Sequence, residues 1–316
     1  SHLEIKIFLY LTATSWKLNP YQKNKYLIPK NHSAYIDFLC ILLMLYTTSL
    51  NSGSNGNCYY IGNNHEAVLV DAGLSCRETE KRMHRLGLQM KTVKAIFVSH
   101  EHGDHIRGVE VLAKKYDLPV FISDITYKHS GLRLPANQLR ILLPGVPVHV
   151  GSLQVKSFLK LHDAADPHSF MISHAGINIG VFTDIGKCCG ELSSHFAQCH
   201  AAYLEANYDI EMLENGRYPV YLKHRIRGGK GHLSNAESLE IFIKHRPSFM
   251  SHLFLSHLSK DNNCPQKVQS LFETHAGDTR IVIASRYEET ELYAICPNTA
   301  APVIVRRLGV QIGLWS

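Results

Sequence analysis

The chain has 316 residues, of which 45% are hydrophobic, so it can bury one large core or two modest ones. Its formal net charge is +6 at pH 7, but residues 1–43 carry five lysines against two acids, and the residues after Pro297 add two arginines. The body between them is almost neutral, which excludes nucleic-acid binding through overall charge and leaves only a local basic patch. The 20 histidines are unusual, because histidine is the commonest metal-binding side chain.

Residues 1–43 differ in composition from the rest, and we expect a domain over 44–297 followed by a tail over 298–316. The prefix contains no methionine and shows no amphipathic period. Two interpretations stay open: an extension foreign to the domain, or a genuine N-terminal arm that packs on it. The apolar run AYIDFLCILLMLY contains Asp37 and is shorter than the roughly 20 residues that span a membrane, so we expect no membrane segment.

Short β-rich runs alternate with amphipathic segments through both halves of the domain. The first half predicts strands over 43–50, 57–62, 66–73, 95–100 and 119–123, with helices over 76–88 and 106–117. The second half predicts strand pairs over 148–162, 170–186 and 279–296, strands over 201–207 and 252–258, and helices over 191–199, 235–246 and 265–275. This alternation predicts an α/β fold with two mixed sheets in the centre and helices on the outer faces.

The eight cysteines are irregularly spaced and form no C-x-x-C pair. Their spacing therefore indicates neither a cysteine zinc site nor a disulfide framework in a chain of this length. Reduced thiols, together with a start that lacks the pattern of a secretory signal, predict a cytoplasmic protein.

Four metal-binding side chains stand together in SHEHGDHIRG, at the end of a predicted buried strand: His100, His102, Asp104 and His105. In an extended segment residues i and i+2 point the same way, so His100 and His102 can share one metal. The turn that follows lets Asp104 and His105 face a second point nearby. Imidazole suits zinc, and a carboxylate adds manganese or iron as options. The alternative is a solvated polar loop.

These four residues match the H-x-H-x-D-H signature, and the chain resembles the metallo-β-lactamase superfamily, which implies a four-layered αββα sandwich. In chain order, Asp71 in LVDAG resembles the acid that supports the metal loop, His162 in LKLHDAADP the next histidine ligand, Asp184 in VFTDIG the bridging aspartate and His257 in LFLSHLSKDNN the last ligand. The words SGSNGN, HDAADP, KGHLSN and SHLSKDNN are similar to the YycJ (WalJ) branch, near the tRNase Z and RNase J nucleases. Asp71 has a plainer interpretation as a turn residue.

The resemblance implies a site for two divalent cations, zinc first, with manganese or iron as alternatives. One cation would be held by His100, His102 and His162, the other by Asp104, His105 and His257, and Asp184 would bridge them. Two cations at this spacing supply a hydroxide near neutral pH and clamp phosphoryl oxygens. Asp104 would also orient that nucleophile.

The segment YLKHRIRGGKGHLSN brings together Arg225, Arg227 and Lys230 with glycines between, and a glycine-rich basic loop before a helix can bind phosphate. A solvated basic turn is the alternative. His232 resembles a histidine that tRNase Z-like enzymes place near the leaving group, paired with a glutamate that Glu205 in YLEANYD resembles. We expect His232 to act as general acid or phosphate ligand, although it could simply precede the helix.

Two further residues, Ser54 and Asn55 in the turn NSGSNG, are candidates for contact with substrate. The leading hypothesis is a two-metal phosphodiesterase, a 5′ exonuclease on DNA or RNA that uses a metal-bound hydroxide and could form a homo-oligomer. No gap between the motifs is long enough for the β-CASP domain of RNase J-type nucleases. The alternatives are a lactonase or glyoxalase II-like hydrolase on the same metals, and a metal-binding regulatory protein without catalysis.

Overall fold

The first sheet combines the early strands with two strands from the end of the described chain. The computed structural model describes residues 43–296 and 303–304. Within these residues the order is β15-β14-β1-β2-β3-β4-β5-β6, with the bounds β1 Leu45–Asn51, β2 Cys58–Gly62, β3 Ala67–Val70, β4 Val93–Phe97, β5 Val120–Ile122, β6 Leu139–Ile141, β14 Tyr293–Ile295 and β15 Val303–Ile304. Neighbours are antiparallel from β15 to β3 and parallel from β3 to β6, so the sheet is mixed.

The second sheet is also mixed and comes from the later part of the chain. Its order is β13-β12-β11-β10-β9-β8-β7, with the bounds β7 Val148–Val150, β8 Leu153–Leu159, β9 His168–His174, β10 Ile177–Phe182, β11 Ala201–Glu205, β12 His252–Ser256 and β13 Arg280–Ile283. Neighbours are antiparallel from β7 to β10 and parallel from β10 to β13. β8, β10, β11 and β12 therefore all run in one direction and end at one edge.

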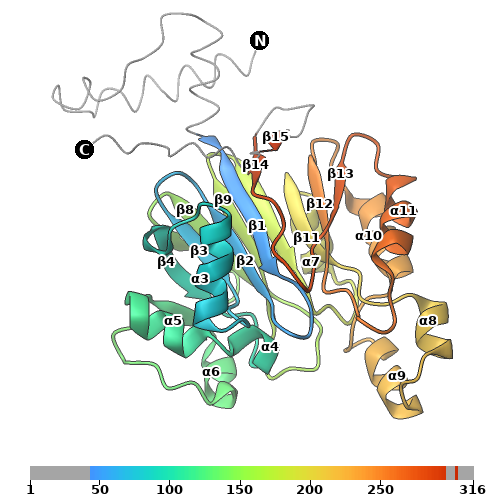
Figure 1. Cartoon of the computed structure of the whole chain (residues 1–316), viewed down its shortest axis with the longest axis horizontal. Coiled ribbons are helices and arrows are strands. Elements are labelled where there is room, and N and C mark those ends of the chain that lie inside the picture. Colours follow the sequence, from blue (N-terminus) through green and yellow to red (C-terminus); the bar gives the residue numbers. More distant parts are fainter. Residues whose placement is uncertain (1–42, 297–302, 305–316) are drawn as a thin grey trace, which may run out of the picture. The chain divides into compact units, whose positions relative to one another are not determined.

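Helices cover the outer faces of both sheets, as Figure 1 shows. On the side of the first sheet lie α3 Cys76–Arg85, α4 Gly103–Ile106, α5 Val109–Tyr116 and α6 Asp124–Ser130, and on the side of the second lie α7 Gly190–Phe196, α10 Asn235–His245 and α11 Pro265–Glu273. The short helices α8 Ile210–Asn215 and α9 Val220–Arg227 lie beside each other beyond the sheet edge, and a 3-10 turn covers Met90–Thr92.

Large buried side chains join the two sheets face to face. Tyr59 of β2 and Tyr203 of β11 have ring centroids 4.8 Å apart, and Phe97 of β4 lies 5.8 Å from Phe170 of β9. Each sheet also packs on its own helices through one further apolar cluster. The cluster of the second sheet includes Phe242 of α10 and Phe272 of α11. The predicted α/β sandwich with outer helices is confirmed.

Two expectations about local structure were wrong. The predicted strand pair over 279–296 is split, because β13 joins the second sheet and β14 the first. The connecting residues follow β12 and then β1: Ala284 N donates to Leu255 O at 2.9 Å, and Thr290 N donates to Ser49 O at 2.9 Å. The basic segment predicted as a loop contains α9, and only residues 228–234 link it to α10.

The expected boundaries of the domain fall at the margins of the described residues. Residues 1–42 lie outside them, as do 297–302 and 305–316, so the interpretations of the prefix and of the tail are not addressed. In the described part of the chain, every helix is too short or too polar to span a membrane.

Candidate active site

The site residues follow the ends of strands that meet at one edge of the sandwich. Asp71 comes directly after β3, and the segment 99–105 follows β4, which is parallel to β3. In the second sheet, His162, Asp184 and His257 follow β8, β10 and β12. Because these strands run in one direction within each sheet, their carboxyl ends bring side chains from distant parts of the sequence to one place.

Three of these residues have left-handed backbones. Asp71, Asp184 and His257 have φ angles of 58°, 54° and 56°, a region that residues other than glycine rarely adopt. Each such residue costs on the order of 1–3 kcal/mol and persists only where its surroundings fix it. Here Asp71 N donates to Phe97 O at 2.8 Å, and His257 N donates to Ser52 Oγ at 2.8 Å. The strain turns the side chains from the strand ends into the site.

His100, His102 and His162 form the first group of donor atoms, all within 4.8 Å of one another. His100 Nε2 lies 3.1 Å from His102 Nδ1, so two ring nitrogens face one point. His162 Nδ1 donates to Gly231 O at 3.0 Å, which directs Nε2 toward the same place. Burial lowers the pKa of His162 to about 4 and the pKa of His100 well below its usual value, so both rings are neutral at pH 7.

Asp104, His105 and His257 form the second group, again within 4.8 Å of one another. Asp104 Oδ2 lies 3.5 Å from His105 Nε2 and 3.7 Å from His257 Nε2. Burial opposes protonation of His257, yet the Asp184 carboxylate, aided by Asp104, raises its pKa to about 10. Burial likewise opposes protonation of His105, while the surrounding carboxylates, that of Asp184 first, raise its pKa well above the usual value.

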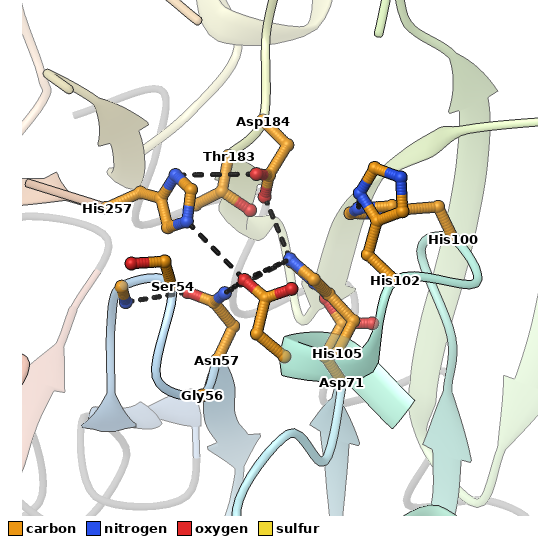
Figure 2. Close-up of polar contacts among 12 residues, drawn as sticks. Ser54, Gly56, Asn57, Asp71, His100, His102, His105, Thr183, Asp184 and His257 are labelled. Carbon is orange, nitrogen blue, oxygen red and sulfur yellow. Dashed lines mark hydrogen bonds and ion pairs between the residues drawn. The ribbon is translucent and has the colours of Figure 1, made fainter. Parts of the chain in front are cut away.

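Asp184 lies between the two groups, as Figure 2 shows. Its Oδ2 is 3.2 Å from His105 Nε2, and its Oδ1 is 3.3 Å from His257 Nδ1 and 4.0 Å from His162 Nε2. Burial alone would raise the pKa of Asp184, but His257 and then His105 lower it well below its usual value. The carboxylate is therefore ionised and contacts donors of both groups.

The donor set fits divalent cations. His162 Nε2, His257 Nε2 and Asp184 Oδ2 are buried, yet none makes a hydrogen bond within the described residues. Buried polar atoms without a hydrogen bond are costly, and their presence in both donor groups and in the aspartate between them indicates ligands. Neutral imidazoles beside ionised carboxylates are donors that zinc prefers and that manganese and iron accept. The raised pKa values of His105 and His257 show the same excess of negative charge, which a cation would balance.

Asp71 supports the second group from behind. Its Oδ2 lies 2.7 Å from His105 Nδ1, and it accepts hydrogen bonds at 2.8 Å from Ser99 N and Ser99 Oγ. A carboxylate that accepts from Nδ1 fixes the imidazole tautomer and directs the Nε2 lone pair away, here toward Asp184. The plainer interpretation of Asp71 as a turn residue does not account for these contacts.

Glu205 and His232 are paired, at a distance of 2.8 Å between Oε1 and Nδ1. The same Oε1 lies 2.9 Å from His257 Nδ1, while Oε2 accepts from Ile185 N at 2.6 Å and from Leu233 N at 3.2 Å. Burial opposes ionisation of Glu205, but His232 and then His257 lower its pKa to about 2. His232 stands just before α10, whose start is fixed by a capping box of Ser234 and Glu237.

The cations expected to bind substrate lie apart from one another. Arg225 Nε pairs with Asp163 Oδ2 at 2.5 Å and lines a cavity beside His232. Arg227 pairs with Glu214 and lines a different hollow, beside α8 and α10. Lys230 is exposed. Since α9 is helical, its cations point in different directions and do not form one phosphate cradle.

The turn between β1 and β2 contributes a residue that the sequence did not single out. Ser54 lines the cavity, and the exposed Asn55 donates through Nδ2 to Arg286 O at 2.7 Å. Asn57, however, points into the site: its Nδ2 lies 3.2 Å from Asp104 Oδ2 and 3.0 Å from His105 Nε2 (Figure 2). In the sequence, Asn57 is marked as a polar residue between a glycine turn and an apolar strand. In the structure it is buried.

Lys160 was also not expected. It is buried, and its Nζ donates to Thr183 O at 2.7 Å, next to Asp184. Burial lowers the pKa of this lysine, and the carboxylates of the site, that of Asp184 first, counteract the effect. Lys160 and His162 follow the end of β8, and both are buried while Leu161 between them is exposed.

Comparison with known proteins agrees with this geometry. The family described as Metallo-beta-lactamase superfamily matches residues 52–169. Exodeoxyribonuclease YycJ from Bacillus anthracis is 36% identical over 222 residues, which are 69% of this chain and 84% of that protein. The chain belongs to the metallo-beta-lactamase superfamily. Within the superfamily it is also similar to Exodeoxyribonuclease WalJ from Streptococcus pneumoniae, at 29% identity over 80% of this chain and 95% of that protein.

Solved structures of superfamily members share the fold. The YhfI protein of Bacillus subtilis superposes with a TM-score of 0.62 at 15% identity, over 79% of this chain and 99% of that one. Human tRNase Z, short form, superposes with a TM-score of 0.54 at 15% identity, over 78% and 98%. At such identities the likeness concerns the sandwich alone.

Proposed function

We propose that this chain is a metal-dependent exodeoxyribonuclease that hydrolyses phosphodiester bonds at the 5′ end of DNA. The observation that carries the proposal is the pair of three-donor groups joined by Asp184, beside a cavity that His232 lines. The relatives named exodeoxyribonuclease, from Bacillus anthracis and Streptococcus pneumoniae, support DNA over RNA. Zinc is the first candidate for both cations because imidazoles dominate the donor set.

Each group would hold one cation: His100, His102 and His162 the first, and Asp104, His105 and His257 the second, with Asp184 shared. Two cations held in this way supply an ionised water near neutral pH and positive charge for the phosphoryl oxygens. Asp104 would orient the water; its carboxylate belongs to the second group, and 18% of its side chain is exposed.

His232 protonates the leaving oxygen. Its Nδ1 faces Glu205, so Nε2 is the nitrogen available to the substrate, and 22% of the side chain remains exposed. Glu205 is fully buried and holds two backbone N–H groups as well, so it orients the ring without reaching the substrate itself. Such a positioned general acid accounts for about 10²–10⁴ in rate.

The phosphate backbone outside the site is bound by cations around the β1–β2 turn. Arg107 Nη1 donates to Asn55 O at 3.1 Å, and Arg286 Nη2 donates to Ser54 Oγ at 3.4 Å. Neither guanidinium forms an ion pair within the described residues, whereas Arg225 does. Unpaired arginines beside the site are better placed than the cations of α9 to bind phosphates.

Labelled nucleic acids test the proposal directly. The purified protein, supplied with zinc or manganese, is incubated with single- and double-stranded DNA and RNA of one sequence, labelled at the 5′ or the 3′ end. We expect release of terminal units from the 5′ ends of DNA and about two metal ions per chain. Both the cleavage and the metal should be lost in His102→Ala and Asp104→Ala. Asp124→Asn, on the exposed helix α6, is the matched control. Turnover of a lactone or thioester without cleavage of any nucleic acid would contradict the proposal.

The expected oligomeric state and cellular location need separate measurements. Assembly into a homo-oligomer is a prediction for light scattering of the protein in solution. A cytoplasmic location is a prediction for fractionation of cells that express the chain.

A further inference from the structure

A cavity of about 200 Å³ opens beside His232 and His257. One wall comes from α9 and the residues before it, namely Tyr218, Leu222 and Ile226; the opposite wall comes from Ser54, Leu258 and Ser259. Pockets that enclose drug-sized ligands measure about 300–1,000 Å³. The cavity is smaller, so its volume suits a single nucleoside.

Three residues on the α9 side of the cavity, Tyr218, Leu222 and Ile226, form an apolar surface that is held in place. Tyr218 and Leu222 pack against the small cluster around Ile226. The Tyr218 hydroxyl donates to Asp261 Oδ2 at 3.0 Å, which fixes the position of the ring. An aromatic side chain beside apolar neighbours is the surface on which nucleobases stack, whatever their sequence.

The arginine and the aspartate that line the cavity neutralise each other. These are Arg225 and Asp163, and the two are paired at 2.5 Å. A phosphate entering the cavity would meet the carboxylate together with the guanidinium, whereas an uncharged base and sugar would disturb neither. The cavity therefore fits the nucleoside part of a nucleotide, while the phosphate stays at the donor groups.

We propose that this cavity binds the terminal nucleoside of the strand, the one whose oxygen leaves phosphorus. The proposal rests on the function proposed above and specifies how a strand end is selected. Water adds to phosphorus, and the bond from phosphorus to O3′ of the terminal nucleoside breaks. O3′ takes a proton from His232, the phosphate stays on the shortened strand, and the proton lost by water passes to solvent, from which His232 is reprotonated.

This arrangement accounts for cleavage at a strand end, and the direction follows from which oxygen leaves phosphorus. Because the volume of the cavity suits one nucleoside, a nucleoside at a strand end fills it more readily than one within a strand. The oxygen that leaves belongs to the nucleoside in the cavity, and when that oxygen is O3′ the nucleoside is the 5′ terminus. End selection thus arises from the shape of the α9 wall.

The test fills the cavity and removes the stacking ring. Leu222→Trp places a large side chain in the cavity, and Val220→Trp, which is 70% exposed on the same helix, is the matched control. Tyr218→Leu removes the ring, and Tyr218→Phe keeps it. Each variant receives single-stranded DNA labelled at the 3′ end, with a 5′-terminal thymidine or a 5′-terminal abasic residue. Methyl p-nitrophenyl phosphate, too small to need the cavity, reports on the metal groups.

We expect Leu222→Trp to lower kcat/KM on thymidine-ended DNA about tenfold or more, chiefly through KM, with the small diester unaffected. Val220→Trp and Tyr218→Phe should match the unaltered protein, which should favour thymidine over the abasic end about tenfold, and Tyr218→Leu should lose that preference. Equal rates for Leu222→Trp and the unaltered protein on DNA, or no preference for a base at the end, would overturn the subsite alone. Failure of the unaltered protein to cleave either DNA or the small diester would overturn the proposed function, and the subsite with it.

Discussion

Removal of the His232 imidazole separates proton donation from the binding of metal. In His232→Ala the two three-donor groups keep every member, because His232 belongs to neither. Glu205 keeps three of its four contacts, namely Ile185 N at 2.6 Å, Leu233 N at 3.2 Å and His257 Nδ1 at 2.9 Å. The substitution therefore removes the proton donor and leaves the rest of the site supported.

The expected losses of stability and of catalytic rate in His232→Ala can both be estimated from the contacts of this histidine. The lost contact, 2.8 Å from His232 Nδ1 to Glu205 Oε1, is a hydrogen bond to a charged group and is worth about 1.5–3 kcal/mol. Since 22% of the side chain is exposed, water can take its place, so the loss of stability should fall at or below the lower end. General acid catalysis contributes about 10²–10⁴ in rate, equal to roughly 3–5 kcal/mol of activation free energy.

Two leaving groups reveal the role in one assay. On DNA, whose leaving alkoxide needs a proton, kcat of His232→Ala should fall at least about a hundredfold. On methyl p-nitrophenyl phosphate, whose phenolate leaves without one, the rate should change little, and the metal content should be unchanged. His224→Ala, an exposed histidine on α9, is the control. Equal losses on both substrates, or loss of metal, would refute the assignment of His232 as proton donor.

Three further predictions concern support, charge and pH. Asp71→Ala should weaken metal binding about 10- to 100-fold, measured by competition with a chelator, because His105 loses its acceptor. Arg107→Ala and Arg286→Ala should each lower the slope of DNA affinity against log salt by about one, with metal content constant. Burial, aided by Arg280, lowers the pKa of His252 from 6.5 to about 4, so this histidine leaves stability untouched above pH 6.5 and reduces it as pH falls toward 4. Relative to His252→Leu, the unaltered protein should thus lose about 2 kcal/mol between pH 7.5 and 5 in denaturant unfolding, and parallel curves would disprove this.

The sequence predicts the fold because the two signals it relies on are local. Alternation in strands and the punctuation of turns depend on neighbouring residues, so runs such as AIFVSH and AAYLEAN are recognised without knowledge of their partners. The separation of β13 from β14 was missed because strand pairing depends on residues far away in the sequence. The segment between the two strands is hydrogen-bonded to Leu255 after β13 and to Ser49 before β14.

The ligands of the H-x-H-x-D-H cluster could be named from their spacing, whereas His162, Asp184 and His257 were named through the resemblance to the superfamily. His100, His102 and His105 lie within one strand end and one helical turn, so their relative directions follow from the backbone. The supporting residues could not be named in the same way. Lys160 and Asn57 act through contacts with Thr183 and Asp104 that only the packed sandwich creates.

The cations predicted to bind substrate show what the sequence cannot give. Composition shows which residues are charged but not which of them form ion pairs. Arg225 and Arg227 stand two residues apart in a basic segment, yet on a helix they diverge, and each meets its own carboxylate, Asp163 or Glu214. Neutralised cations contribute little to the salt-dependent attraction of DNA. What remains at the site is a cavity of about 200 Å³ with one aromatic wall. Under the proposed function, affinity for the backbone therefore comes from Arg107 and Arg286, which form no ion pair within the described residues, and selection of the strand end comes from the shape of the cavity.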